Sequence, residues 1–439
     1  MRARVAFQAL ELTRKSCLRS GPICAVPANL RTRFSVADKD FYSLAWGLAL
    51  FVLMHAHMNT QTSLAAAAYP FPSHNVPALP CAAADGQLEI LSAAELARRA
   101  LPVPDSFALR FPRHWRSNPV QNRASAWIES ETLAWLRTHG IGVEADEAEK
   151  LRKFNCAGYG GYSMPQADPE KALLVMQFIA LWLFWDDLQV EEELGWDATA
   201  VVQALTSAEA PRSQSRYIAA WADLGRRLQR TQSQLWLRQL TTTMQQWLDN
   251  AKFETRMARA FQAGHCPDFS TAFDCRTISI GMYPTVHLIE YAEGLEMPFT
   301  FHQHPAVRKL KRLASRLVGM GNELGGLAKD LRQRWINLVS ILHAQGVPGQ
   351  RSLAGAFQHL VDIHNADVQE FDQVAAALPS WGKELDAQLG HWVRALRYNV
   401  YGFTLWESVA ERYQEHKAVL GTLPLVAPVL AAGVSAKVG

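Results

Sequence analysis

A row of acidic side chains follows a long apolar run near the middle of the chain. Residues 172–183 are almost wholly apolar, and residues 184–193 read F-W-D-D-L-Q-V-E-E-E. Like charges crowded at the end of a buried helix are costly unless a cation joins them. Asp186, Asp187 and Glu191 offer carboxylate oxygens, the ligands that Mg²⁺ prefers, from one rim of a helix. The spacing predicts a divalent-metal site, although an isolated D-D-x-x-x-E also occurs at solvated helix ends.

A second polar stretch lies at residues 321–330, G-N-E-L-G-G-L-A-K-D. Asn322, Gly326 and Asp330 are spaced i, i+4 and i+8, so on a helix they drift by only about 80° over two turns. An amide oxygen and a carboxylate on one helix face can form a second site for a hard cation, with Lys329 beside it. Taken alone, the stretch also fits an ordinary helix with a polar face.

The two stretches, in this order, resemble the two metal-binding motifs of class I terpene synthases. In that family the first motif is rich in aspartate, and the second reads N-x-x-x-S-x-x-x-E. Gly326 stands here in place of the family's Ser or Thr, so a water is expected to supply the missing oxygen. Asp330 stands in place of Glu and is one methylene shorter, so its helix is expected to lie closer to the ion.

Two further stretches strengthen the resemblance. Arg276 lies 46 residues before Asn322 (322 − 276), where bacterial members place an arginine that senses diphosphate. The residues that follow Arg276, T-I-S-I-G, resemble the family's helix break, whose linker and effector positions would fall on Ser279 and Ile280, next to Gly281.

Near the C-terminus, W-E-S-V-A-E-R-Y resembles the family's W-x5-R-Y ending. This segment begins at Trp406, and the resemblance implies that Arg412 and Tyr413 bind diphosphate. The resemblance covers residues 102–420. It implies an enzyme, a terpene synthase that acts as a carbon–oxygen lyase on a phosphate ester.

The resemblance also implies a reaction. Three Mg²⁺ ions and the cationic side chains would stabilise the charge that develops on a departing diphosphate. Farnesyl diphosphate is the expected substrate, and a cyclised sesquiterpene is the expected product. The expected catalytic residues are Asp186, Arg276, Arg412 and Tyr413; the metal site adds Asp187, Glu191, Asn322, Gly326 and Asp330, and the diphosphate site adds Lys329.

Aromatic side chains would line the cavity in which the carbocation forms. Aromatic faces attract cations without offering a nucleophile. Phe178 and Trp182 precede Asp186 at helical spacing, so they would run down into the bundle. Each aromatic residue would serve equally well in core packing. The expected cavity lining is Phe178, Trp182, Ser279, Ile280, Gly281 and Trp406.

Helices must position these residues. The chain is 49% apolar, holds fourteen Trp, and shows little strand-like alternation after its first third. These features predict an all-α, single-domain helical bundle around a central cavity. The predicted helices cover residues 124–139, 168–187, 216–228, 235–260, 282–293, 307–337, 354–378 and 381–420.

Three segments are expected along the chain: an extension over residues 1–100, a cyclase domain over 101–420, and a tail over 421–439. The first 34 residues carry seven Lys and Arg and one acid, so this segment has a charge of +6 and the remainder −3. The extension is expected to be disordered, and its association with a membrane is not favoured. A mildly acidic body gives no reason to expect nucleic-acid binding.

The six cysteines are scattered, without C-x-x-C or histidines at metal spacing. This pattern predicts a cytoplasmic protein without a zinc site. His287 and His391, on apolar faces, are interpreted as core residues.

Other functions remain open at this point. A chain-elongating prenyltransferase or a squalene-synthase-like enzyme would carry two aspartate-rich motifs. A cyclase of geranyl or methylated geranyl diphosphate would differ only in cavity size. A non-catalytic helical binder would retain the fold alone. The sequence leaves the product, the role of the extension and the choice between monomer and homodimer undetermined.

Overall fold

The computed structural model describes residues 79–80, 109–186, 198–207, 215–333, 335–346, 353–414 and 428–430. The chain divides into two units, Met1–Asn75 and Val76–Gly439, and the first lies outside the described residues. The prediction of a disordered extension therefore concerns residues that are not described, apart from 79–80. The predicted boundaries at residues 100 and 420 stay predictions.

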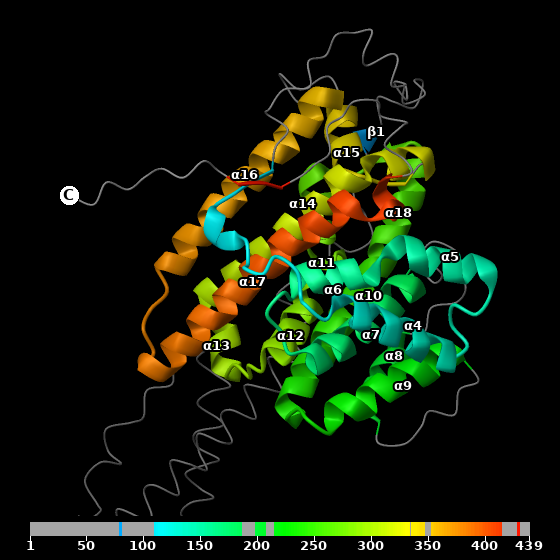
Figure 1. Cartoon of the computed structure of the whole chain (residues 1–439). Helices are drawn as coiled ribbons and strands as arrows, with labels where there is room; N and C mark the ends of the chain where they lie inside the picture. Colours follow the sequence, from blue (N-terminus) through cyan, green and yellow to red (C-terminus); the bar gives the residue numbers. More distant parts are fainter. Residues whose placement is uncertain are drawn as a thin grey trace, which may run out of the picture. The chain divides into compact units, whose positions relative to one another are not determined.

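The second unit is a bundle of helices, which confirms the all-α prediction (Figure 1). The helices are η3 (Arg113–Trp115), α4 (Ser125–Thr138), α5 (Ala145–Phe154), α6 (Cys156–Ser163), α7 (Pro169–Asp186), α8 (Ala198–Thr206), α9 (Arg216–Gln229), α10 (Gln234–Gln262), α11 (Phe269–Ser279), α12 (Met282–Glu293), α13 (Phe299–Gln303), α14 (Pro305–Gln333), α15 (Leu338–Gln345), α16 (Leu353–Ala376), α17 (Lys383–Val409) and α18 (Glu411–Gln414).

Two pairs of very short strands add to the bundle. β1 (Leu79–Pro80) pairs antiparallel with β3 (His265–Cys266), and β2 (Leu109–Phe111) pairs parallel with β4 (Pro428–Leu430). Strands of two or three residues are too short to form a sheet core of their own. Their contribution is local: Phe111 in β2 is fully buried and packs edge-on against Tyr401, with ring centroids 5.4 Å apart.

Several helices begin where the sequence pattern places them. α12 has the predicted bounds, and α7 begins at Pro169, one residue after its predicted N-cap. The Asp168 carboxylate accepts hydrogen bonds from the backbone amides of Glu170 and Lys171, at 3.1 and 3.3 Å. These amides have no partner inside the helix, so the carboxylate satisfies them.

Two predicted helices are interrupted before their predicted ends, and residues 415–420 of the second lie outside the described residues. The helix predicted for 307–337 ends at Gln333, and Asn337 instead caps α15, accepting a hydrogen bond from the Val339 amide at 2.9 Å. The helix predicted for 381–420 ends at Val409, because Ala410 is extended with ψ 129°. α18 follows this turn and carries the end of the predicted diphosphate motif.

The sequence pattern did not predict α6, which is rich in glycine. Asn155 begins this helix in the left-handed region, with φ 49°, and its side chain accepts a hydrogen bond from the Gly158 amide. α6 packs against α17 at Gly402, where a Cβ atom would collide with the backbone of Tyr162. A glycine is therefore required where the two helices meet.

α14 is the central helix of the bundle. It contacts α11, α12, α16 and α17, and Figure 1 shows it running alongside the last two. α7 packs against α4, α6, α9 and α12. The two helices that carry the acidic motifs thus share α12 as a neighbour. Among the described helices, none combines the length and apolarity needed to cross a lipid bilayer.

Candidate active site

Asn322 on α14 is the centre of a polar network. Its side-chain nitrogen donates hydrogen bonds to Glu407 Oε1 at 2.9 Å and to the Tyr413 hydroxyl at 3.0 Å, while its oxygen accepts one from Arg276. The structure therefore brings together three of the predicted site residues from α11, α14 and α18. Because the nitrogen has two acceptors, the amide oxygen is the atom that faces the positively charged Arg276 guanidinium.

Arg276 is largely buried among carboxylates. Its guanidinium contacts Glu323 Oε1 at 2.6 Å and Glu254 Oε1 at 3.3 Å. Burial acts to lower the pKa of Arg276, but the surrounding carboxylates raise it above its ordinary value; these are Glu254, Glu323, Asp330 and Asp186. Carboxylates of both acidic motifs therefore act on one guanidinium.

Asn337, which the sequence did not indicate as a site residue, contacts the second acidic motif at Asp330. Asp330 Oδ2 accepts a hydrogen bond from the Asn337 side chain at 2.8 Å. The same oxygen lies 3.5 Å from the point where a Cβ atom would stand at Gly326. The short Asp330 side chain therefore stays close to its own helix, beside the position where the family has a hydroxyl. Lys329, next to Asp330, is half-buried.

Two buried carboxylates, Glu323 and Glu407, also belong to the network and were missed. Burial raises the pKa of Glu407 to about 8, although the Asn322 hydrogen bond opposes this, and burial raises the pKa of Glu323 to about 7 against the attraction of Arg276. Glu407 lies over the space left by two glycines: its oxygens are 3.4 Å from a Cβ position at Gly321 and 3.7 Å from one at Gly325. In the sequence, only the two glycines one turn apart, Gly321 and Gly325, hinted that another side chain packs against this face of α14.

Arg412 lies at the edge of the same network. Its guanidinium carbon is 4.6 Å from the centre of the Phe154 ring and 5.9 Å from that of Tyr413. The charge of Arg412 also opposes the rise that burial causes in the pKa of Glu407. Arg412 therefore contacts Tyr413 and acts electrostatically on Glu407, two members of the Asn322 network.

Trp406 connects α17 to the preceding part of the chain. Its indole nitrogen donates to the backbone oxygens of Phe154 and Asn155, at 2.9 and 3.0 Å. Its ring lies edge-on to Tyr159 and to Tyr413, with centroid distances of 5.3 and 5.5 Å. These contacts position α18, and the cavity-lining role predicted for Trp406 stays a prediction.

A row of aromatic rings runs back from Asp186 along α7. The rings of Phe178 and Trp182 are 6.1 Å apart and nearly perpendicular, and Trp182 stands 4.7 Å from Trp247 of α10. Trp247 donates a hydrogen bond to the Ser279 backbone oxygen at 2.7 Å. These contacts bring Ser279, Ile280 and Gly281, the residues of the predicted helix break, against the aromatic row.

Gly281 forms the break between α11 and α12. Its φ is 78°, and a Cβ atom there would lie 2.5 Å from the Trp182 ring. We expect Gly281→Ala to lower the free energy of unfolding by about 2–4 kcal/mol, because a left-handed backbone and an overpacked contact both cost energy. Urea denaturation followed by circular dichroism measures this loss.

Gly346→Ala is the matched control for that experiment. Gly346 also has a positive φ, 62°, but no atom of the described residues lies within 4 Å of its Cβ position. This variant should lose only about 1 kcal/mol, the backbone part of the cost. Equal losses in the two variants would show that the Trp182 contact contributes nothing.

The first motif is described only in part. Asp186 is the last residue of α7 and is half-buried, whereas Asp187 and Glu191 lie outside the described residues. The donors that are described are an amide oxygen and carboxylate oxygens, which suit a hard divalent ion such as Mg²⁺. A guanidinium already rests on the Asn322 oxygen, so the position is one that accepts positive charge.

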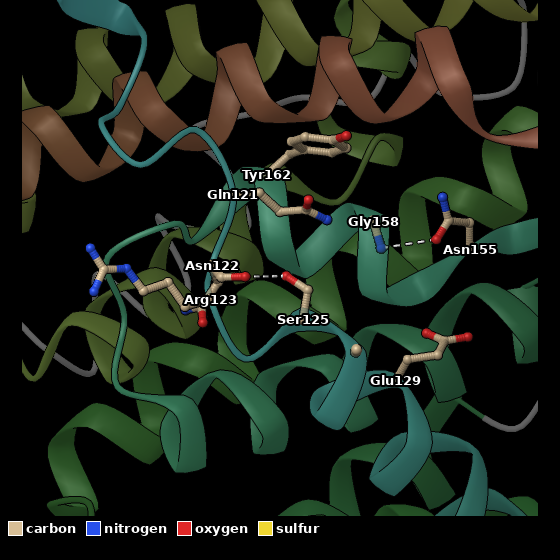
Figure 2. Close-up of a pocket in the computed structure, with 9 residues that line it drawn as sticks. Gln121, Asn122, Arg123, Ser125, Glu129, Asn155, Gly158 and Tyr162 are labelled. Atoms are coloured by element: carbon tan, nitrogen blue, oxygen red, sulfur yellow. Dashed lines mark hydrogen bonds between the residues drawn. The ribbon is translucent and has the colours of Figure 1, made fainter.

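A pocket of about 740 Å³ lies elsewhere, beside α4 and α6 (Figure 2). None of the predicted site residues lines it. Its polar walls are partly held by internal hydrogen bonds, such as that from the Ser125 hydroxyl to the Asn122 backbone oxygen at 2.6 Å. The lining residues are Gln121, Asn122, Arg123, Ser125, Ala126, Glu129, Asn155, Gly158 and Tyr162.

Comparison with known proteins finds similarity to terpene synthases. Residues 177–370 match the family model described as "Terpene synthase family 2, C-terminal metal binding". The chain is 25% identical to a (+)-T-muurolol synthase of Roseiflexus castenholzii, over 65% of this chain and 88% of that protein. It is also 25% identical to a 10-epi-cubebol synthase of Sorangium cellulosum, over 67% and 94%.

A solved structure supports the same fold. Wild-type cucumene synthase superposes with a TM-score of 0.54 at 21% identity, covering 65% of this chain and 96% of that one. Residues 177–370, which match the family model, include Asp186, Arg276 and Asn322, all members of the site described above. The described part of the chain therefore has the fold of class I terpene synthases, and residues 177–370 match the metal-binding domain of terpene synthase family 2.

Proposed function

We propose that this enzyme ionises farnesyl diphosphate with the help of Mg²⁺ and cyclises the resulting carbocation to a sesquiterpene, releasing diphosphate. The observation that carries the proposal is the hydrogen-bonded group of Arg276, Asn322 and Tyr413. The charges of Asp186 and Asp330, one from each acidic motif, both raise the pKa of Arg276. Farnesyl diphosphate is chosen because the T-muurolol synthase is named as cyclising that substrate, and another relative is a sesquiterpene synthase.

The network would hold metal and diphosphate in different ways. Asp186 and Asp330 would contribute carboxylate oxygens, and Asn322 an amide oxygen, to three Mg²⁺ ions, with Asp187 and Glu191 joining from beyond α7 and a water at Gly326. When bound, the ions would act as Lewis acids on the diphosphate oxygens. The hydrogen bonds from Asn322 to Glu407 and Tyr413 would keep its oxygen available to a bound ion.

The cationic side chains would take the diphosphate itself. Arg276 now donates to Asn322, so its guanidinium would exchange that oxygen for a diphosphate oxygen when an ion arrives. Arginine can bind phosphate oxygens through two parallel hydrogen bonds. Lys329, Arg412 and the Tyr413 hydroxyl would provide further donors.

The aromatic row would protect the carbocation. An allylic cation reacts with water, so its surroundings must be dry and must offer no nucleophile. The faces of Phe178 and Trp182 meet both conditions, and an aromatic face attracts a desolvated cation by about 2 kcal/mol or more. The break at Ser279, Ile280 and Gly281 would bring backbone dipoles against the same space.

Product analysis tests the proposal. Purified protein would be incubated with Mg²⁺ and, separately, with geranyl, farnesyl and geranylgeranyl diphosphate, and the volatile products identified by gas chromatography and mass spectrometry. We expect a cyclic sesquiterpene from farnesyl diphosphate. Product from geranyl diphosphate alone would favour a monoterpene cyclase, and no product from folded protein would indicate a non-catalytic binder.

Glu407 should tune the affinity for Mg²⁺ by orienting Asn322. Glu407→Ala removes one of the two acceptors that hold the Asn322 nitrogen and leaves only the Tyr413 hydroxyl, so the amide is oriented less firmly. We expect the Mg²⁺ concentration for half-maximal turnover to rise about tenfold or more, as is typical when a partner of a metal ligand is lost. Glu407→Gln keeps an oxygen acceptor and should change it much less. An unchanged Mg²⁺ requirement in Glu407→Ala would refute this role.

The location and assembly of the enzyme are also proposals. We place it in the cytoplasm, because Cys156 and Cys275 are free, buried thiols, as is usual where cellular reductants keep cysteines reduced. Both a monomer and a homodimer are compatible with the network, since its described members come from one chain.

A further inference from the structure

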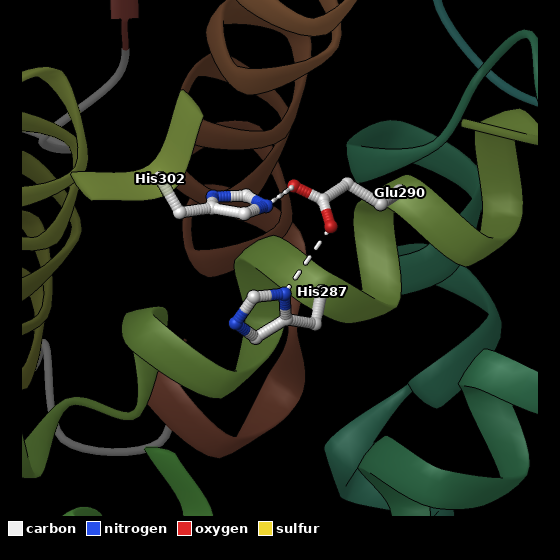
Figure 3. Close-up of side chains that lie close together, drawn as sticks. All are labelled: His287, Glu290 and His302. Carbon is white, nitrogen blue, oxygen red and sulfur yellow. Dashed lines mark hydrogen bonds and ion pairs between the residues drawn. The ribbon is translucent and has the colours of Figure 1, made fainter. Parts of the chain in front are cut away.

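Three side chains with metal-binding atoms converge in the core, outside the network around Asn322. His287 and Glu290 lie one turn apart on α12, and His302 comes from α13 (Figure 3). His287 Nδ1 is 3.2 Å from Glu290 Oε2, and His302 Nε2 is 3.3 Å from Glu290 Oε1. All three residues are at most 2% exposed.

The spacing of these atoms fits a small metal ion. One ligand atom from each residue lies within 4.8 Å of the others. In a tetrahedral zinc site with bonds of about 2.0–2.1 Å, neighbouring ligand atoms are about 3.3 Å apart. Each histidine nitrogen lies at about that distance from Glu290, but from a different carboxylate oxygen: Oε2 for His287 and Oε1 for His302. Two imidazoles and one carboxylate form a donor set that suits Zn²⁺, whereas Mg²⁺ prefers oxygen alone.

His302 gives a second, independent indication of a ligand. Both of its ring nitrogens are buried: among the described residues Nδ1 has no hydrogen-bond partner, and Nε2 has only the 3.3 Å contact with Glu290 Oε1. A buried polar group left unsatisfied costs about 1–3 kcal/mol, so such a group usually has a partner. A metal ion bound to Nε2 would supply one.

The surroundings of Glu290 are also those of a metal ligand. The Trp392 indole donates a hydrogen bond to Glu290 Oε1 at 2.9 Å, which fixes the carboxylate. The His287 and His302 rings lie 5.2 Å apart and tilted by 69°, so both face the carboxylate without stacking. Partners of this kind orient ligands in metal sites. Lys311 is another positive group that interacts with Glu290 and would compete with a metal ion for it. Burial lowers the pKa of Lys311 to about 8, although the attraction of Glu290 opposes this.

We propose that His287, Glu290 and His302 bind one Zn²⁺ ion with a water as the fourth ligand, forming a structural site that joins α12 to α13. The site is distinct from the Mg²⁺ site: Lys311, which interacts electrostatically with Glu290, lies 11 residues before Asn322 on α14, which corresponds to about 16 Å along a helix. Histidine spacing in the chain gave no hint of it, because His302 follows His287 by 15 residues.

The wild-type protein provides the first test. The full chain would be incubated with Zn²⁺ in the presence of excess Mg²⁺, which occupies oxygen-only sites, and then desalted. We expect about one zinc ion per chain by mass spectrometry of the metal, and nitrogen or oxygen ligands at about 2.0–2.1 Å by X-ray absorption at the zinc edge. Zinc content near zero would overturn the proposal and leave a cluster held by hydrogen bonds and Lys311.

Variants provide the second test. His302→Gln and Glu290→Gln should bind zinc at least about tenfold more weakly, and added zinc should no longer raise their melting temperatures. His364→Gln is the matched control, because His364 is equally buried but packs against Phe111. Zinc retained at wild-type affinity in His302→Gln would refute the site. If the variants fail to fold, as judged by circular dichroism, the absorption spectrum of the wild type decides.

Discussion

Asp186→Ala will abolish the turnover of farnesyl diphosphate and leave the helical bundle folded. Asp186 ends α7 and is half-buried, so its carboxylate is available to an ion and contributes little to the core. Its charge acts on Arg276, which in turn donates to Asn322. Removing it takes a ligand from the ions that stabilise the departing diphosphate. We expect kcat/KM to fall about a thousandfold or more, corresponding to about 4 kcal/mol of transition-state stabilisation.

Asn322→Ala should have a similar effect from the opposite side of the site. This variant removes the amide oxygen and leaves Glu407 and Tyr413 without their shared donor. Steady-state kinetics at saturating Mg²⁺ measures both variants, and thermal melting shows that they are folded. Glu170→Ala is the control: it removes one exposed carboxylate from the first turn of the same helix as Asp186 and should retain wild-type kinetics. Near-normal turnover in both site variants would refute the metal assignment.

Local sequence patterns predicted the helices that local interactions determine. α12 has its predicted bounds, and α7 begins after an aspartate cap, because apolar spacing and capping act within a few residues. The breaks at Asn337 and Ala410 were not predicted. Asn337 caps α15 and also binds Asp330, and the Leu338 amide donates to Glu323, so contacts with α14 stop the helix. Such contacts join residues that periodicity does not relate.

In the site, too, residues in local motifs were predicted, whereas residues that matter through tertiary packing were missed. The motif residues Arg276, Asn322 and Tyr413 were expected to act together, and the structure places them in hydrogen-bond contact. Glu323 and Glu407 were missed because their importance comes from burial beside those residues, which the packing of α14 against α11, α15 and α17 creates. The roles of the individual site residues, including the cavity lining, stay predictions.

Arg276→Ala is the second substitution with a large expected effect. It should reduce both the stability of the fold and the rate of turnover, so the two losses must be measured separately. The Arg276 guanidinium neutralises Glu254 and Glu323, which are both largely buried. Removing one partner of a buried ion pair costs about 3–5 kcal/mol, because a charge is left without compensation. Arg276→Ala should therefore lower the melting temperature markedly and also lower kcat/KM about a thousandfold. Arg276→Lys keeps the charge but not the forked donors, so its loss in kcat/KM should be smaller, about ten- to a hundredfold.

The double variant Arg276→Ala with Glu323→Gln separates the two losses. The Glu323→Gln substitution removes the buried charge and keeps a side-chain oxygen for the Leu338 amide, so most of the stability lost in Arg276→Ala should return. Turnover should not return, because no donor replaces the guanidinium at the diphosphate. A double-mutant cycle on melting temperature and on kcat/KM measures both quantities in the same four proteins. If stability and turnover recover together, Arg276 acts by holding the fold; if only stability recovers, Arg276 binds the leaving group.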